Sequence, residues 1–112
     1  MLRVEAILRP ESVEQTVEKL EEIGCNGITK KEVEGHGKQK GIVEQFRGKE
    51  YKLTFIPKVK IEMVIKDELK DKVVDAIIKI SDTGRPGDGK IFISEEKNAI
   101  RVRTNERGEI AL

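Results

Sequence analysis

A strand–helix pattern occurs twice in this 112-residue sequence, and it limits the possible folds more than any other feature. Apolar and mostly charged side chains alternate over residues 2–9, which predicts a strand with one buried face. The helix that follows carries an apolar stripe formed by Val13, Val17, Leu20 and Ile23. We expect Ser12 and Gln15 to form a capping box at its start and Gly24 to end it. Residues 27–35 are predicted to form the next strand.

The same order of elements returns in the second half of the chain. Residues 58–65 alternate as a strand, Asp67 is expected to cap a helix, and 90–94 read as the last strand of the unit. The inward positions of this second helix are Leu69, Val73, Ala76, Ile77 and Ile80. Right-handed crossovers then give an α+β, ferredoxin-like double βαβ fold, with a four-stranded antiparallel sheet and both helices on one face. We expect another subunit to cover Ile7 and Val64 on the other face.

Composition excludes several classes of protein. With 22 basic and 21 acidic residues the net charge is +1, so no general attraction to nucleic acid or to an anionic membrane is implied. The length suits a single domain over residues 1–112. No apolar run approaches the roughly 20 residues that span a bilayer, and the N-terminus lacks a signal peptide pattern. The single cysteine, Cys25, is expected to be buried and to fit a reducing compartment, so we predict a cytoplasmic protein.

The stretch from Gly35 to Lys58 cannot build a core of its own. It opens with three closely spaced glycines, carries five lysines and arginines before Lys58, and has few apolar side chains. Long segments of this kind inside small domains are usually functional or disordered. We interpret it as a flexible functional arm whose shape depends on what binds at its base. Tyr51 within it suits a protein contact or a covalent modification, with simple loop packing as the alternative.

A glycine-rich turn at 84–90, GRPGDGK, nearly matches the phosphate-binding pattern G-x-x-x-x-G-K. Ile91 stands where that pattern needs Ser or Thr to hold magnesium, and a strand follows instead of a helix, so this is no Walker motif. Closely spaced glycines still let backbone N–H groups converge on an anion, and Lys90 adds a cation. A plain turn between a helix and a strand is the alternative.

A second basic cluster follows in the predicted short strand 99–103. Arg101 and Arg103 are two residues apart, so they project to the same side of a strand. Ile100 and Val102 are expected to face inward. Guanidinium groups bind phosphate oxygens in pairs, so a second cluster of this kind favours a polyphosphate ligand, although such pairs often only face solvent.

Catalytic alternatives find little support in the sequence. His36 is the only histidine, lies between two glycines, and has no second histidine or cysteine beside it to make a metal site. A small phosphotransferase would need a general base, and Asp88 is the only carboxylate in the turn 84–90. An RNA-binding sheet needs aromatic residues on its central strands, and Phe55 and Phe92 are nearly the only candidates.

Several separated motifs resemble the PII nitrogen-signalling family in order and spacing over essentially the whole chain. They are GHGKQKG at 35–41, the pairs Arg47-Gly48 and Glu50-Tyr51, IPKVKIE at 56–62, TGRPGDGKIFI at 83–93 and IRVRT at 100–104. The resemblance implies a homotrimer with ATP or ADP in the clefts between subunits. It also implies that 2-oxoglutarate binds with Mg²⁺ and ATP at the base of the arm, called the T-loop, at about 36–54. No enzymatic turnover is implied.

The same resemblance assigns roles to individual residues. Nucleotide phosphates would contact one subunit through Gly35, Gly37, Lys38, Gln39 and the turn residues Gly87, Asp88, Gly89 and Lys90. The neighbouring subunit would supply Arg101 and Arg103, and the adenine would lie near Thr29 and Val64. The 2-oxoglutarate set is Gln39, Lys40, Gly41 and Lys58. In this set the side-chain oxygen of Gln39 would face Mg²⁺, and Lys58 would pair with a carboxylate of the keto acid.

The resemblance also implies partners. Arg47 looks like the arm-tip arginine that enters the cytoplasmic mouth of an ammonium transporter, so a membrane would be reached only through a protein. Glutamine synthetase is an alternative target. The sequence departs from the family pattern at Phe46, where a tyrosine is usual, at Lys49, where a small residue is usual, and at Lys38, where arginine is frequent. Uridylylation of Tyr51 therefore stays open, and Lys49 excludes the serine phosphorylation known in some relatives.

Overall fold

The computed structural model describes residues 1–37, 43–46, 49–52 and 55–112, with the backbone alone for 43–46 and 49–52. Its strands are β1 Leu2–Leu8, β2 Ile28–Gly35, β3 Val43–Phe46, β4 Lys49–Lys52, β5 Ile56–Ile65 and β6 Gly89–Glu95. Its helices are α1 Pro10–Ile23 and α2 Lys70–Ser81, with short 3₁₀ turns at Asp67–Leu69 and Gly108–Ala111.

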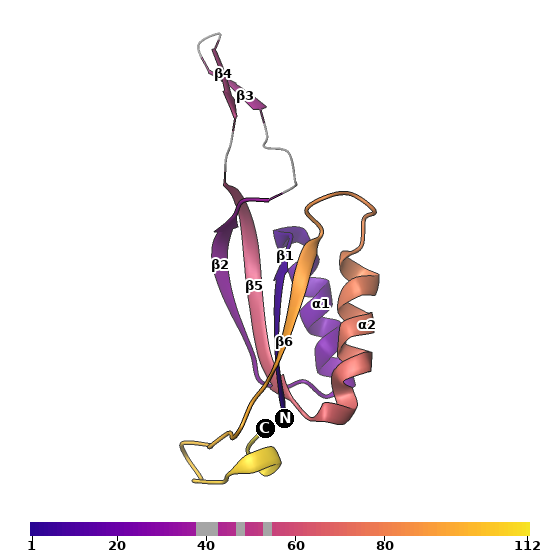
Figure 1. Cartoon of the computed structure of the whole chain (residues 1–112), viewed down its shortest axis with the longest axis vertical. Helices are drawn as coiled ribbons and strands as arrows, with labels where there is room; N and C mark the ends of the chain where they lie inside the picture. Colours follow the sequence, from indigo (N-terminus) through magenta and orange to yellow (C-terminus); the bar gives the residue numbers. More distant parts are fainter. Residues whose placement is uncertain (38–42, 47–48, 53–54) are drawn as a thin grey trace.

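Four strands form one sheet in the order β2-β5-β1-β6, and every neighbouring pair is antiparallel. Both helices lie on the same face of this sheet (Figure 1). Two βαβ units interleaved in this way are the ferredoxin-like arrangement, so the predicted fold is confirmed. Because β1 lies between β5 and β6, the first strand of the chain is one of the two central strands of the sheet.

The core fills the space between the helices and the sheet. Alternate residues of β1 and β5 face the helices, and these positions are buried: Val4, Ala6, Leu8, Val59, Ile61, Met63 and Ile65. Helix α1 contributes Val13 and Leu20, and α2 contributes Val73, Ala76 and Ile77. Cys25 is also buried, as predicted, and burial raises the pKa of its thiol.

Both predicted helix caps are wrong, for local reasons. Helix α1 begins at Pro10, whose fixed φ suits a first helical turn, so Ser12 lies inside the helix and is buried. The end of α1 is as predicted, because Gly24 adopts a left-handed conformation with φ 110°. Asp67 caps nothing with its side chain; its carboxylate instead lies 3.0 Å from the N-terminal ammonium group.

The strand expected at 99–103 is also wrong. Only an isolated bridge joins Ile100 to Arg107, and the residues between them turn back on themselves. Val102, expected to face inward, is 98% exposed, and Ile100 is 52% exposed. The chain forms a tight turn here instead of a strand, because both backbone groups of Arg101 make hydrogen bonds to nearby residues. Its N–H donates to the Glu106 carbonyl, and its carbonyl accepts from the Asn105 N–H.

The arm contains regular structure that the sequence reading did not predict. Strands β3 and β4 form a separate two-stranded antiparallel sheet, with Phe46 opposite Lys49. This hairpin stands away from the body of the molecule, beyond the ends of β2 and β5 (Figure 1). Arg47 and Gly48 separate the two strands in the sequence, and glycine is a preferred residue in two-residue hairpin connections.

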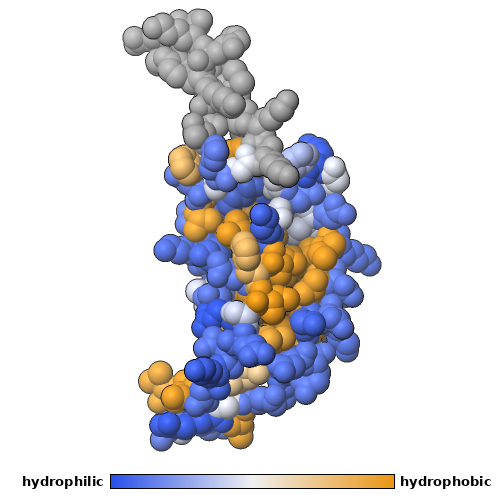
Figure 2. All heavy atoms as spheres, viewed as in Figure 1, coloured by the Kyte–Doolittle hydropathy of each residue, from blue (hydrophilic) through white to orange (hydrophobic). Residues whose placement is uncertain are grey.

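Apolar side chains remain exposed in two main areas of the isolated chain (Figure 2). One lies along α2 and β6, where Ile78 and Ile93 are 50% and 43% exposed. The other is the C-terminal segment, which includes Val102 and Ile110. The sheet face away from the helices is more polar than expected. There Arg3 pairs with Glu62 and Glu96, and Lys60 pairs with Glu5, while Ile7 and Val64 are half-buried.

Gly89 should be the least replaceable glycine of the sheet. Its φ is +132°, and a Cβ at this position would lie 2.3 Å from the Ile7 carbonyl oxygen. We predict that Gly89→Ala lowers the free energy of unfolding by at least about 2 kcal/mol, because it adds a steric overlap to an unfavourable backbone conformation. Urea unfolding at one fixed protein concentration measures the effect. Gly27→Ala is the control, since nothing lies within 4 Å of its Cβ position. Equal stability of the two variants would contradict the close approach.

Candidate functional site

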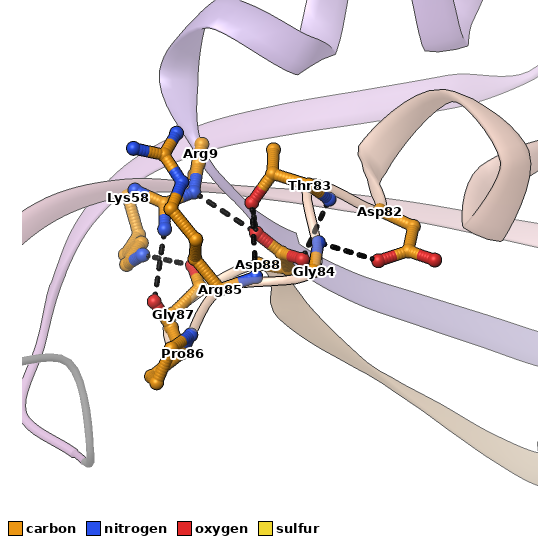
Figure 3. Close-up of polar contacts among 9 residues, drawn as sticks. All are labelled: Arg9, Lys58, Asp82, Thr83, Gly84, Arg85, Pro86, Gly87 and Asp88. Atoms are coloured by element: carbon orange, nitrogen blue, oxygen red, sulfur yellow. Dashed lines mark hydrogen bonds and ion pairs between the residues drawn. The ribbon is translucent and has the colours of Figure 1, made fainter.

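The glycine-rich turn joins the end of α2 to the start of β6 and is held by the Asp88 side chain (Figure 3). Its carboxylate accepts a hydrogen bond from the Thr83 N–H at 2.7 Å and another from the Thr83 hydroxyl. Arg9 donates to the same carboxylate from Nε at 3.3 Å. These hydrogen bonds, those from Thr83 above all, hold the pKa of the Asp88 carboxyl well below its usual range.

Two cations reach this turn from neighbouring strands (Figure 3). Arg9 follows the last residue of β1 and also donates from Nη2 to the Pro86 carbonyl at 2.9 Å. Lys58, on β5, donates from Nζ to the Gly87 carbonyl at 2.5 Å. Lys58 is only 8% exposed, and burial, followed by the nearby Arg9 charge, lowers the pKa of its ammonium group. The turn is therefore contacted by two cationic side chains as well as by its own carboxylate, Asp88.

The base of the arm meets this turn. Gly35 ends β2 where the arm begins, and its Cβ position lies 3.3 Å from Cγ of Lys58. Gly37 is exposed two residues further on. Lys90 is exposed on β6, opposite Ile7 of β1. The structure thus brings Gly35, Lys58 and the turn residues Gly87–Lys90 together at one end of the sheet.

A second group of predicted site residues gathers at the opposite end. Thr29 and Val64 line a hollow together with Glu62 and the C-terminal Leu112. Arg101 belongs to the same end, because its Nη2 donates to the Leu112 carbonyl at 3.2 Å and Nη1 pairs with Glu106. Arg103 lies exposed in the adjoining turn. Arg101 and Arg103 are not presented by a strand, so the argument from strand alternation does not hold for them.

The two groups are far apart within one chain. Val64 is paired with Arg3, whereas Gly89 is paired with Leu8, five residues along β1. At a rise of about 3.4 Å per residue this is about 17 Å along the sheet. Thr29 lies on β2 and Gly89 on β6, which are the two edge strands. One subunit therefore holds the two halves of the predicted nucleotide site at opposite edges and opposite ends of its sheet.

Part of the predicted site lies outside the described residues. This is the case for Lys38, Gln39, Lys40, Gly41 and Arg47. The backbone of Tyr51 lies in β4 opposite Glu44. Their ligand and partner roles stay predictions.

Sequence reasoning missed Arg9 and Thr83, whose hydrogen bonds to the predicted residue Asp88 hold the turn. A threonine five residues before an aspartate gives a weak turn signal at best. Arg9 is 77 residues from Pro86 in the chain, and only the pairing of β1 with β6 brings them together. No pattern within the sequence indicates that pairing at this register.

The geometry argues against the chemical alternatives. Asp88 is a poor general base, because hydrogen bonds from Thr83 and Arg9 stabilise its ionised form. Within residues 1–37 and 55–112, no group of three His, Cys, Asp or Glu side chains is arranged to hold a metal ion. His36 is exposed and packs at 5.7 Å against the ring of Phe55. The central strands β1 and β5 carry no aromatic residue, so the sheet offers no platform for stacking RNA bases.

No helix in the described part of the chain has the length and apolar character needed to cross a membrane. The fold and the site together define a class of protein. It is a ferredoxin-like α+β domain with a hairpin arm whose base lies at the same end of the sheet as a glycine-rich turn. Comparison with known proteins identifies the family. The model of the family described as nitrogen regulatory protein P-II matches residues 1–106.

Relatives agree over nearly the full length. The nitrogen regulatory protein P-II of Bradyrhizobium diazoefficiens is 50% identical over 108 residues, which cover 96% of each chain. Nitrogen regulatory protein P-II 2 of Methanothermobacter thermautotrophicus is 47% identical and covers 100% of this chain and 97% of its own. The solved structure of B. subtilis GlnK matches with a TM-score of 0.81 at 38% identity, covering 99% of this chain and 97% of that one. The chain belongs to the nitrogen regulatory protein P-II family, whose members are signalling proteins and not enzymes.

The lowered pKa of Asp88 predicts how the contribution of this residue to folding stability depends on pH. Because the folded value lies below the unfolded one, its stabilisation is fully present above the ordinary carboxyl pKa of about 4 and is lost as the pH falls towards the folded value. The stability difference between the wild type and Asp88→Asn should be constant at neutral pH and narrow below about pH 4. Chemical denaturation at a series of pH values measures it.

Asp75→Asn is the matched control, since Asp75 is exposed on α2 and makes no hydrogen bond or ion pair to the described part of the chain. That variant should stay close to the wild type in stability at neutral pH. If the stability difference between the wild type and Asp88→Asn stayed unchanged down to pH 3, the hydrogen bonds drawn in Figure 3 would be contradicted.

Proposed function

We propose that this chain acts as a homotrimeric sensor of ATP or ADP and 2-oxoglutarate that regulates nitrogen assimilation by presenting its arm to target proteins. The observation that carries the proposal is the hydrogen bond from Lys58 Nζ to the Gly87 carbonyl. It joins the strand that leaves the arm to the turn that would hold phosphate. A ligand that competes for either group would therefore change the base of the arm.

The nucleotide would lie between two subunits. One subunit would offer Gly35, Gly37 and the turn Gly87–Lys90 to the phosphates. Its neighbour would offer Arg101 and Arg103, with Thr29 and Val64 near the adenine. The separation of these two groups within one chain supports this division, because a second copy can bring together what one sheet holds at opposite edges. The exposed apolar side chains of β6, α2 and the C-terminal segment offer surface for contact between subunits.

The keto acid would bind at the base of the arm, with Lys58 pairing to one carboxylate and Gln39, Lys40 and Gly41 completing the site. Magnesium would join the ATP phosphates, the keto acid and the side-chain oxygen of Gln39, offsetting the charge of two anions. If the ligands share a metal in this way, their affinities must be linked, and each must tighten the binding of the other by the same factor. The protein would work in the cytoplasm and reach a membrane only through a partner.

Arg103→Ala should weaken ATP binding by roughly 1.5–3 kcal/mol, the range for hydrogen bonds between charged groups, and leave the oligomer intact. Isothermal titration calorimetry measures the affinity, and light scattering measures the oligomer. Arg107→Ala is the control, because it removes a cation from the same segment whose guanidinium contacts only Asn105 within the described residues. Unchanged affinity of the Arg103 variant would count against the intersubunit site.

The target would be an ammonium transporter, since a three-fold channel would match three arms around one axis. We predict that Arg47→Ala abolishes the block of ammonium uptake by the ADP-bound protein while nucleotide affinity stays normal. A transport assay with the cognate channel in vesicles measures the block, and Lys52→Ala in the same hairpin is the control. Addition of 2-oxoglutarate with Mg²⁺ and ATP should release the wild type.

Either of two results would overturn the ammonium transporter as the target. One is that the Arg47→Ala variant still blocks transport, and the other is that 2-oxoglutarate with Mg²⁺ and ATP strengthens docking. A wild type that ignores the channel but binds glutamine synthetase under the same ligands would point to that enzyme as the target instead.

A further inference from the structure

We propose that Arg9 is a positioning residue of the nucleotide site: its guanidinium fixes the glycine-rich turn in the shape that presents backbone N–H groups to phosphate. The inference rests on the proposed function of the turn, and it concerns a residue outside the motifs from which the resemblance to the family was drawn. It follows from the contacts between the end of β1 and residues Thr83–Asp88.

Arg9 contacts the turn at two separate places. Nε donates to the Asp88 carboxylate at 3.3 Å, and Nη2 donates to the Pro86 carbonyl at 2.9 Å. The side chain is only 12% exposed, so it is confined to this position and is not a freely moving surface charge. One planar group therefore links a side chain and a backbone carbonyl two residues apart, which restricts the backbone between them.

The part of the turn between these two contacts is Gly87. Its φ is +92°, a conformation that glycine adopts readily. Because glycine has no side chain, the conformation of this residue has to be fixed by its neighbours. Lys58 holds its carbonyl, and its N–H donates no hydrogen bond within the described residues. A peptide with its carbonyl held and its N–H unused is suited to bind an anion, provided that its neighbours are fixed. Arg9 holds both neighbours, Pro86 and Asp88.

The contacts continue into the rest of the turn. Asp88 binds Thr83 through both the N–H and the hydroxyl, and the Thr83 hydroxyl oxygen also lies 3.3 Å from the Arg85 nitrogen. Asp82 accepts from the Gly84 N–H at 2.8 Å. Two side chains from the middle of the sheet contact the turn: Lys58 of β5 contacts Gly87, and Arg9, which follows the last residue of β1, contacts Pro86 and Asp88. Of these two, Arg9 is the one that the structure shows contacting the turn at two places.

Arg85 provides a matched comparison. It lies in the same turn and carries the same charge, but its side chain is exposed and its guanidinium makes no hydrogen bond to the described residues. Loss of Arg85 removes charge from the turn without loosening it. Loss of Arg9 does both, so the two variants separate positioning from simple attraction.

The experiment measures ATP affinity by calorimetry for the full chain and for Arg9→Gln, Arg9→Lys, Arg85→Gln and Asp88→Asn. Hydrogen exchange of the Gly84–Gly89 amides is measured on the ligand-free proteins. We expect Arg9→Gln to weaken ATP binding about tenfold and to speed exchange in the turn, whereas Arg85→Gln changes the affinity less than about threefold. Arg9→Lys keeps the charge but loses the planar guanidinium that donates at two places. Its ATP affinity should therefore lie between those of Arg9→Gln and the wild type.

A double variant tests whether Arg9 acts through Asp88. If it does, Arg9→Gln combined with Asp88→Asn should bind ATP little worse than the weaker-binding single variant, because both changes break one network. Should Arg9→Gln fail to fold, Asp88→Asn and Thr83→Val loosen the same turn and must give the same pattern of affinity and exchange.

The outcomes distinguish this inference from the function on which it rests. If the wild type binds ATP and Arg9→Gln matches Arg85→Gln in both affinity and exchange, the positioning role is wrong and the nucleotide site stands. If Arg9→Gln speeds exchange without a loss of affinity, the clamp is structural only and the inference is overturned. If the wild type binds neither ATP nor ADP, the proposed function fails, and the role of Arg9 at a nucleotide site fails with it.

Discussion

The pairing of β1 on both of its edges is the constraint on which the rest of the structure depends. Between β5 and β6, this strand supplies Val4, Ala6 and Leu8 to the core and brings both halves of the chain into one sheet. Its last residues also set the position of the glycine-rich turn. Gly89 passes so close to the Ile7 carbonyl that no side chain fits between them, and Arg9 reaches across to Pro86 and Asp88. Core and turn are therefore fixed by the same strand.

The electrostatics of the turn follow from this arrangement. Arg9 and Lys58 lie close enough that the charge of Arg9 lowers the pKa of the Lys58 ammonium group, in addition to the larger effect of burial. Asp88 is the carboxylate that offsets this charge, and its hydrogen bonds to Thr83 keep it ionised. Arg9 and Lys58 therefore both lie beside closely spaced glycines, with Asp88 between Arg9 and Thr83. That is a suitable environment for a phosphate or a carboxylate ligand and an unfavourable one for a general base.

A single chain leaves apolar surface uncovered at β6, α2 and the C-terminal segment, and it holds the Thr29–Val64 hollow far from the turn. Both facts have one physical explanation if subunits assemble around an axis, since assembly buries exposed apolar area and joins opposite edges of neighbouring sheets. A signalling protein built in this way would bind its ligand only where two copies meet.

The sequence by itself determined the fold, because alternation in strands and the 3.6-residue stripe of helices are local consequences of which side chains must be buried. It also indicated the glycine-rich turn, the lysine at the far end of the arm and the family, since these depend on short motifs at fixed spacing. Three predictions from the sequence were wrong. Helix α1 begins at Pro10, so Ser12 is not its cap, and Asp67 pairs with the N-terminal ammonium group instead of capping a helix. Residues 99–103 form a turn held by local hydrogen bonds and not a strand. Only the tertiary structure decided that Arg9 holds the turn and that Thr29 and Gly89 lie at opposite edges. The reason is physical: strand order and register join residues tens of positions apart, and no local pattern of side chains records which strands become neighbours.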